Sequence, residues 1–343
     1  QISKLNYFIM FGRRSSILIG CISCLLLVLF SDILISLFEP TIEVTLKANS
    51  YLVIRSIGLP FYLLNMHSTA VLRGMKHPKI TLYSSIIVGA SNVVLSFVLA
   101  VVFDFGIQGI AIASSISFLI SALYSTKVLL NKQQKDDSFD VLVDKKEVSR
   151  KFFYVGFYIF VRSMFLTIFM AYLRNRASLM SMEEIALQHV LLQLWSFGYV
   201  FVDALAIAAQ TLVSEYKTKF HDYRNSDLKK YLNKLTLRIS VFLFLFSSVF
   251  LDILITLITD RSLAQFIDFE LRILFGLSLL VGSFAFLWDG VLLGLDKSKE
   301  FSSLTVVSSI IGFISCSYFL NFENTLSSLW IGLNLSLVYR GVA

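Results

Sequence analysis

Three ionisable side chains, Arg162, Asp203 and Asp289, lie inside long apolar segments of this 343-residue chain. A charge at the middle of a bilayer costs about 2.5–3.5 kcal/mol on insertion scales, so each one needs a partner or an aqueous cavity. One base set against two acids leaves one carboxylate without a counter-charge. We therefore predict that Asp203 and Asp289 couple to a proton or another cation, with Arg162 as their electrostatic partner. The alternative is a buried ion pair between Arg162 and one of the acids that fixes the register of the helices.

Further polar residues follow a helical spacing through the segment that carries Asp203. Steps of three and four residues place them on one helical face once apolar Val200 and Ile207 fill the gaps, and we expect that face to point into a helix bundle. This polar stripe consists of His189, Gln193, Ser196, Asp203, Gln210 and Ser214. Across the whole chain, the candidates for lining a cavity are Gln193, Ser196, Gln210, Tyr62, Asn65, Asn92 and Trp288.

The segments that position these residues are those of a membrane protein. The chain is 56% hydrophobic with only 15% charged residues, against roughly 25% charged in a soluble domain, and its mean hydropathy is +0.76. Its apolar windows of about 20 residues are long enough to cross a hydrocarbon core of about 30 Å. Few prolines and long Leu, Ile, Phe and Val runs favour helices over a β-barrel. We predict an all-α membrane protein with ten transmembrane helices at 15–38, 51–72, 80–103, 107–130, 152–173, 185–213, 235–259, 271–293, 301–320 and 326–343.

The net charge of +7 reflects membrane topology rather than nucleic-acid binding. Counted along the predicted spans, 23 of the 30 Lys and Arg residues fall in segments on one side of the membrane, with Arg340 among them, and five on the other. The positive-inside rule assigns the basic side to the cytoplasm. No nucleic-acid partner is expected, and the predicted partners are the lipid bilayer, a small organic substrate and a coupling ion.

An internal repeat divides the chain into two homologous halves. The segment 32–37, Asp-Ile-Leu-Ile-Ser-Leu, returns as Asp-Ile-Leu-Ile-Thr-Leu at 252–257, and the same shift of 220 carries 72–76 onto 292–296. Six spans separate equivalent positions, so both halves enter the membrane in the same direction and the repeat is parallel. Two spans of the second half have no partner in the first. We therefore expect an N-terminally incomplete sequence of a twelve-helix protein with two pseudo-symmetric six-helix lobes.

This repeat defines the predicted domains. Residues 1–130 form the remainder of the first lobe, 131–151 a cytoplasmic linker, and 152–343 the second lobe. We expect the protein to be a monomer.

The sequence carries no sign of an enzyme. It lacks the Gly-x-x-x-x-Gly-Lys-[Ser/Thr] motif of nucleotide hydrolysis, metal-ligand spacings and nucleophile constellations. Cys21, Cys24 and Cys316 lie in apolar spans and are interpreted as small buried residues. No cofactor is expected. Energy for any transport would come from an ion gradient, since one proton crossing 100 mV provides about 2.3 kcal/mol.

Several motifs resemble one transporter family. Tyr51 to Pro60, followed by Leu-Arg-Gly-Met-Lys at 72–76, is similar to the fourth helix and following loop of multidrug and toxic compound extrusion (MATE) transporters, in particular their DinF-like branch. Residues 191–195 and 203–210 resemble the eighth helix of that branch, and Trp288 to Gly294 resembles the tenth. The resemblance implies twelve helices in two lobes around a central cavity, of which helices three to twelve are present. It also implies export coupled to proton or sodium entry.

The sequence departs from this family at positions tied to coupling. Asn92 matches an Asn of the fifth family helix, but Ser96 stands where an Asp often follows it. We therefore expect coupling to rely on Asp203 and Asp289. The predicted function is an ion-driven antiporter that exports small organic compounds, of multidrug, toxin or organic-acid type. The alternatives are a flippase for lipid-linked precursors of the same superfamily and a degenerate membrane protein that does not transport.

Overall fold

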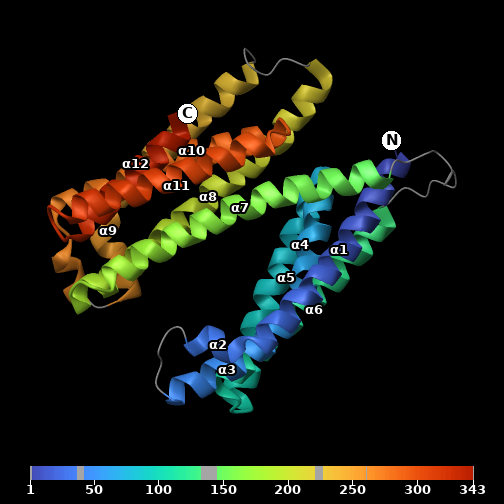
Figure 1. Ribbon diagram of the computed structural model, residues 1–343, viewed down its shortest axis with the longest axis horizontal. Coiled ribbons are helices and arrows are strands. Elements are labelled where there is room, and N and C mark those ends of the chain that lie inside the picture. Colours follow the sequence, from blue (N-terminus) through green and yellow to red (C-terminus); the bar gives the residue numbers. More distant parts are fainter. Residues whose placement is uncertain (1, 37–41, 133–144, 221–226, 260, 343) are drawn as a thin grey trace. The chain divides into compact units, whose positions relative to one another are not determined.

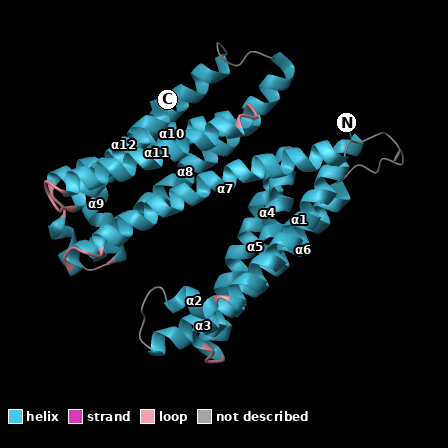
Figure 2. Ribbon diagram, viewed as in Figure 1, coloured by secondary structure: helices cyan, strands magenta, loops and turns pink. Residues whose placement is uncertain are grey.

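The computed structural model describes residues 2–36, 42–132, 145–220, 227–259 and 261–342. Within these ranges the secondary structure is helical, without strands (Figure 2). The chain divides into two compact units, residues 1–151 and 152–343, which are treated separately below. The prediction of an all-helical membrane protein is confirmed.

The first unit is built around the helix at its C-terminal end, α6. This helix packs against α3, α4 and α5, while α1 packs against α3 and α4 (Figure 1). Serine and alanine on its packed faces, among them Ala111, Ser117 and Ser121, let neighbouring helices approach closely. The elements are α1 (Ile2–Leu29), α2 (Ser31–Ser36), α3 (Ile42–Ile57), α4 (Leu59–Gly74), α5 (Pro78–Ser96), the π-helical turn η1 (Phe97–Val102) and α6 (Gly106–Lys132).

The second unit is organised around α10, which packs against α8, α9, α11 and α12. Its start is fixed by Asp268, whose carboxylate accepts a hydrogen bond from the Leu271 amide at 2.7 Å and so caps the helix. The helix α7 begins before the boundary between the units and runs on into the second. The elements are α7 (Lys145–Ala177), α8 (Met182–Phe220), α9 (Asp227–Ile258), the 3-10 turn η2 (Arg261–Phe266), α10 (Phe269–Gly294), α11 (Ser298–Leu320) and α12 (Leu326–Val342).

Eight of the described helices are long and apolar enough to cross a membrane, which makes the chain an integral, multi-pass membrane protein. Two of the ten predicted spans differ. The span expected at 51–72 consists of two helices of 16 residues each, α3 and α4, divided at Gly58. Pro60, which lacks an amide hydrogen, lies in the first turn of α4, where no intrahelical donor is needed. The span expected at 326–343 is the 17-residue helix α12.

Other predicted boundaries shift outward. The first helix begins at Ile2 rather than at residue 15, and most of the predicted linker 131–151 lies outside the described residues. Its last part, from Lys145 onward, is the first turns of α7 rather than solvated coil.

The internal repeat is visible in the backbone of two helix-to-helix turns. Lys76 after α4 and Asp296 after α10 both have φ of 63°, a left-handed conformation that is uncommon outside glycine. The amide of His77 donates to the carbonyl of Leu72 at 2.9 Å, and the amide of Lys297 donates to that of Leu292 at 2.9 Å. The same turn, with the same hydrogen bonds, therefore recurs at equivalent positions of the two halves.

Candidate functional site

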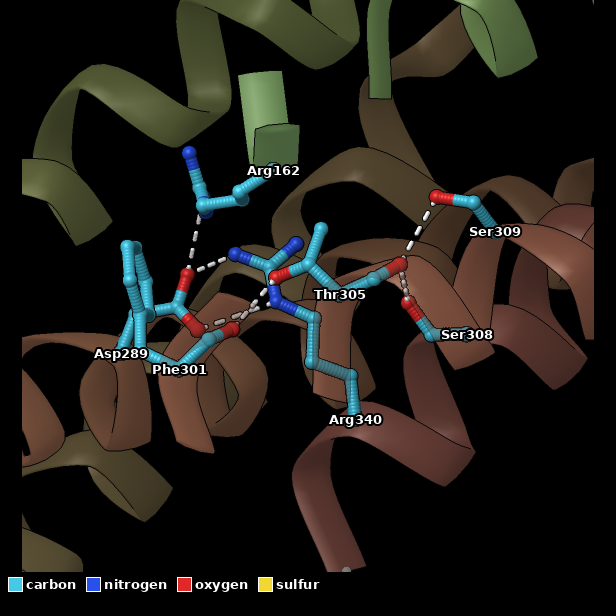
Figure 3. Close-up of polar contacts among 7 residues, drawn as sticks. All are labelled: Arg162, Asp289, Phe301, Thr305, Ser308, Ser309 and Arg340. Atoms are coloured by element: carbon cyan, nitrogen blue, oxygen red, sulfur yellow. Dashed lines mark hydrogen bonds and ion pairs between the residues drawn. The ribbon is translucent and has the colours of Figure 1, made fainter. Parts of the chain in front are cut away.

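A buried carboxylate on α10 binds two arginines from different helices. Asp289 is 8% exposed. Arg162 of α7 donates from Nη2 to its Oδ2 at 3.0 Å, and Arg340 of α12 donates from Nε to its Oδ1 at 3.1 Å and from Nη2 to its Oδ2. Figure 3 shows both guanidinium groups turned toward this one carboxylate. Asp289 thus links three helices of the second unit.

Aromatic rings complete the environment of the arginines. The Cζ atom of Arg162 lies 4.5 Å from the centroid of the Phe301 ring, and that of Arg340 lies 4.9 Å from the centroid of Phe286. Contacts of this kind stabilise a guanidinium through the electron-rich face of the ring. They compensate part of the hydration that both arginines lose on burial.

Nearby hydroxyl groups on α11 do not join this ion-pair cluster. Thr305 donates to the carbonyl of Phe301 at 3.1 Å, and Ser308 and Ser309 donate to that of Thr305 at 2.9 and 2.8 Å (Figure 3). These bonds stay within one helix, so the hydroxyls are satisfied locally. Among the described residues, the charge of Asp289 is balanced by arginine alone.

The charge pattern of the sequence groups Arg340 with the cytoplasmic basic residues, so the count of charges inside the spans leaves it out. In the structure the residue is 4% exposed and paired with Asp289. The second unit thus holds two bases at this site, the buried Arg340 and the half-buried Arg162, against Asp203 and Asp289. A signal was present in the sequence: Leu333, Leu337 and Arg340 follow each other at steps of four and three, which places Arg340 on the buried face of α12.

Asp203 on α8 differs from Asp289 in its surroundings. It is exposed and makes no hydrogen bond or ion pair with any residue that the structure describes. It nevertheless interacts electrostatically with Arg162 and Arg340. Two bases and two acids therefore act on one another, and only one of the two carboxylates is held by direct contacts.

The polar stripe does share one face of α8, but that face is not packed inside the second unit. All six of its residues are exposed, whereas Leu187, Leu191, Val202 and Val213 on the other side are buried. A polar face toward lipid is unfavourable, because its groups would lose hydrogen bonds to water without replacement. The stripe is therefore better suited to water or to a polar protein surface than to lipid.

The buried side of α8 is held against α10 by glycines. Gly290 and Gly294 form a Gly-x-x-x-Gly pattern, and a Cβ on Gly290 would lie 2.2 Å from the carbonyl oxygen of Ala206. A Cβ on Gly294 would lie 2.7 Å from the carbonyl oxygen of Gln210. Small residues at this spacing allow helix backbones to approach closely in membranes. The close approach fixes the stripe relative to Asp289.

In the first unit, the predicted cavity residues Asn65 and Asn92 lie in hydrogen-bond networks between helices. Asn65 is buried, and its Oδ1 accepts hydrogen bonds from Ser84, Ser121 and Ser125 at 3.0, 3.3 and 2.8 Å. Asn92 donates to Ser114 at 3.0 Å and accepts from Ser96 at 3.1 Å. Both amides connect neighbouring helices.

The two remaining cavity candidates are aromatic. Tyr62 is half-buried against Phe118, with ring centroids 4.9 Å apart. Trp288 is also half-buried, and Lys229 of α9 lies with its Nζ 5.5 Å from the ring centroid. No group of three or more metal-ligating side chains occurs among the described residues.

The sequence has relatives of known name. The MatE family model matches residues 6–101. Protein DETOXIFICATION 42 of Arabidopsis thaliana is 25% identical over 292 residues, which cover 84% of this chain and 55% of that protein. Protein DETOXIFICATION 44, chloroplastic, of the same plant is 26% identical over 338 residues, 95% of this chain and 62% of that protein. The chain therefore spans a little over half the length of these relatives.

Solved structures share the fold. An outward-facing multidrug resistance MATE family transporter of the MOP superfamily matches with a TM-score of 0.88 at 16% identity, over 98% of this chain and 76% of that one. The chain therefore has the fold of MATE transporters, and its residues 6–101 match the MatE family model. A MATE protein in a bent conformation matches with a TM-score of 0.84 at 16% identity, over 99% of this chain and 80% of that one. The family resemblance expected from the motifs at 51–60, 72–76, 191–210 and 288–294 is thus confirmed.

Proposed function

We propose that this MATE protein acts as an ion-coupled antiporter that exports small organic compounds, and that Asp203 is the carboxylate that exchanges the coupling ion. The observation that carries the proposal is the contrast between the two acids of the second unit. Asp289 is buried and bound by two arginines, whereas Asp203 is exposed and has no direct partner among the described residues. Only Asp203 can take up a proton or a cation without first breaking an ion pair.

The charge count gives the coupling a physical basis. With all four groups ionised, Arg162, Arg340, Asp203 and Asp289 sum to zero. Uptake of one proton or sodium ion at Asp203 leaves a net charge of +1, which repels a cationic substrate and weakens the field that Asp203 exerts on the arginines. Ion and cationic substrate thus compete for one negative site, which is the requirement for exchange. A membrane potential of 100 mV acting on one charge supplies about 2.3 kcal/mol, enough for a roughly fifty-fold gradient.

The exposed polar stripe provides the surface along which the solute contacts the protein. Gln193, Ser196 and Gln210 offer donors and acceptors on the same face as Asp203. The relatives named for detoxification and the multidrug resistance transporter of the same fold support an organic solute. A flippase for lipid-linked precursors would favour an excess of basic groups, but the two arginines of this site are matched by two acids.

Reconstitution in proteoliposomes tests the proposal. An outward-directed gradient of ethidium, a cation, or of 4-aminohippurate, a carboxylate, is combined with an imposed pH or sodium gradient. We expect gradient-driven efflux of at least one probe, loss of that efflux in Asp203→Asn, and unchanged efflux in Ser303→Ala, a control at an exposed position of α11 outside the polar stripe. Efflux that is the same with and without the pH and sodium gradients would contradict ion coupling. If neither probe is transported, the result would favour the alternative of a protein that does not transport.

A further inference from the structure

The first unit contains an arginine that no acid balances among the residues that the structure describes. Arg55 lies near the C-terminal end of α3 and is half-buried. Its Nη1 is fully covered and forms no hydrogen bond, and the guanidinium makes no ion pair with any residue in the described part of the chain. Asp32 accepts from Asn49 at 2.5 Å, and Glu43 pairs with Lys47 at 2.7 Å. Asp104, which precedes α6, is exposed and forms no ion pair with Arg55.

This situation is unfavourable unless a group other than the described residues binds the guanidinium. A charged side chain within a membrane span is rare and marks pathways for ions or substrates. A buried donor without a partner destabilises the folded state, and more so when it is charged. In the second unit, each guanidinium of the candidate site forms an ion pair with a carboxylate. The lack of such a partner therefore distinguishes Arg55 from the arginines of that site.

Aromatic residues surround the unpaired group. The Cζ atom of Arg55 lies 5.1 Å from the centroid of the Phe118 ring. The ring of Tyr62 meets Phe118 edge to face, with centroids 4.9 Å apart and an interplanar angle of 78°. The Tyr62 hydroxyl makes no hydrogen bond to a described residue either. Two unused donors, a guanidinium and a phenol, therefore flank one aromatic ring.

The backbone next to Arg55 is shaped to leave room for it. The chain breaks between α3 and α4 at Gly58, where a Cβ would lie 3.1 Å from Nη1 of Arg55 and 2.7 Å from Oγ of Ser115. Any larger side chain would push the guanidinium away from this position. The helix break and the glycine thus position Arg55 beside Phe118.

We propose that Arg55, Tyr62 and Phe118 form a binding subsite for the carboxylate of a small aromatic acid. Nη1 of Arg55 is covered, but Nε and Nη2 are not among the covered atoms. These two nitrogens present parallel N–H donors that match the two oxygens of a carboxylate. The Tyr62 hydroxyl adds a third donor, and Phe118 offers an apolar face for an aromatic group. This proposal depends on the proposed function in one respect: it takes the ligand to be a transported solute. Equilibrium binding tests it without any ion gradient.

Calorimetric titration of the purified protein in detergent with benzoate is the direct experiment. We expect benzoate to bind, the neutral analogue benzamide to bind at least tenfold more weakly, and Arg55→Gln to weaken benzoate binding about tenfold to a hundredfold. Arg55→Lys keeps the charge but not the paired donors and should recover only part of the loss. Arg272→Gln removes an arginine that pairs with Asp252 at 2.7 Å and should leave binding unchanged.

Thermal unfolding separates binding from a structural role. Because Arg55→Gln removes an unpaired buried charge, the variant should be at least as stable as the wild type in the absence of ligand. A large loss of stability in that variant would make Arg55 a structural residue and overturn the proposal. Tyr62→Phe, which removes a single hydroxyl, provides an independent variant and should weaken benzoate binding several-fold.

Three other results would also overturn the subsite. They are equal affinity for benzoate and benzamide, unchanged benzoate binding in Arg55→Gln, and displacement of benzoate by an equal concentration of chloride. Displacement by short-chain phosphatidylglycerol would assign the site to a lipid headgroup instead of a solute. Because none of these measurements involves transport, their failure leaves gradient-driven efflux of ethidium untouched, and the reverse also holds.

Discussion

Replacement of Asp289 by asparagine should destabilise the second unit strongly, although it changes only one oxygen for an NH2 group. The carboxylate is the direct partner of two arginines, one of them 4% exposed. Removal of one partner from a buried ion pair leaves an uncompensated charge and costs about 3–5 kcal/mol. We expect a loss of this size in Asp289→Asn, because the buried guanidinium of Arg340 then faces an amide that cannot balance it.

A second substitution should restore most of that loss. Asp289→Asn combined with Arg340→Met removes the most deeply buried charge, and the methionine side chain fills much of the space of the arginine stem. The double variant should therefore regain about 2 kcal/mol or more of the lost stability. The Asp203→Asn variant serves as the matched control. Asp203 is exposed and has no direct partner among the described residues, so its replacement should change stability by less than about 1 kcal/mol.

Thermal unfolding in detergent, followed by a thiol-reactive dye or by circular dichroism, measures these differences. The order of stability should be wild type and Asp203→Asn first, the double variant next and Asp289→Asn last. A wild-type melting temperature for Asp289→Asn would refute the reasoning. A double variant less stable than the single one would do so as well, because it would show that Arg340 stabilises the fold independently of Asp289.

Three other substitutions have definite expected outcomes in the same unfolding assay. Gly290→Leu should lower the free energy of unfolding by about 2 kcal/mol or more, because its Cβ would lie 2.2 Å from the Ala206 carbonyl oxygen. The control Gly156→Ala, where a Cβ would have nothing within 4 Å, should be neutral or stabilising. Equal effects of the two substitutions would argue against the close helix contact. Asn65→Ala should cost about 1–3 kcal/mol, since three serine hydroxyls lose their shared acceptor, and a wild-type melting curve would contradict that network. Lys76→Val should cost about 1 kcal/mol or more, because a β-branched residue is strained at φ of 63°, and an unchanged stability would mean that the turn relaxes.

The sequence was sufficient to predict an all-helical membrane protein and its resemblance to MATE transporters. Apolar windows of membrane-spanning length do not depend on tertiary context, because a helix in lipid must satisfy its own backbone. The constant offset of the internal repeat was also informative, and the matching turns at Lys76 and Asp296 show that the repeat extends to backbone geometry. The resemblance to MATE transporters depended on motifs spread over the chain.

The details of the site were less predictable. The charge of Arg340 was visible, but its position at the end of the last apolar segment is equally typical of a cytoplasmic anchor, and only packing against α10 distinguishes the two. The polar stripe on α8 could be drawn from spacing alone. Which side of α8 packs against α10 depends instead on small residues such as Ala206 and Gly290, which meet in space although they lie far apart in the sequence.

The broken span around Gly58 shows a related limit. A hydropathy window averages over a break, so 51–72 looked like one helix although Gly58 and Pro60 divide it. The polar residues along that span likewise lie in two environments. Asn65 and Thr69 lie in a buried hydroxyl network, whereas Arg55 and Tyr62 keep donors that no described residue uses.

The most direct test of the central claim compares two transport modes of the Asp203→Asn protein in the same proteoliposomes. One mode is exchange of labelled for unlabelled ethidium without an ion gradient, and the other is ethidium efflux driven by an imposed pH or sodium gradient. If Asp203 carries the coupling ion, exchange persists in the variant while the response to the gradient disappears. A variant that still responds to the gradient as the wild type does would contradict this assignment.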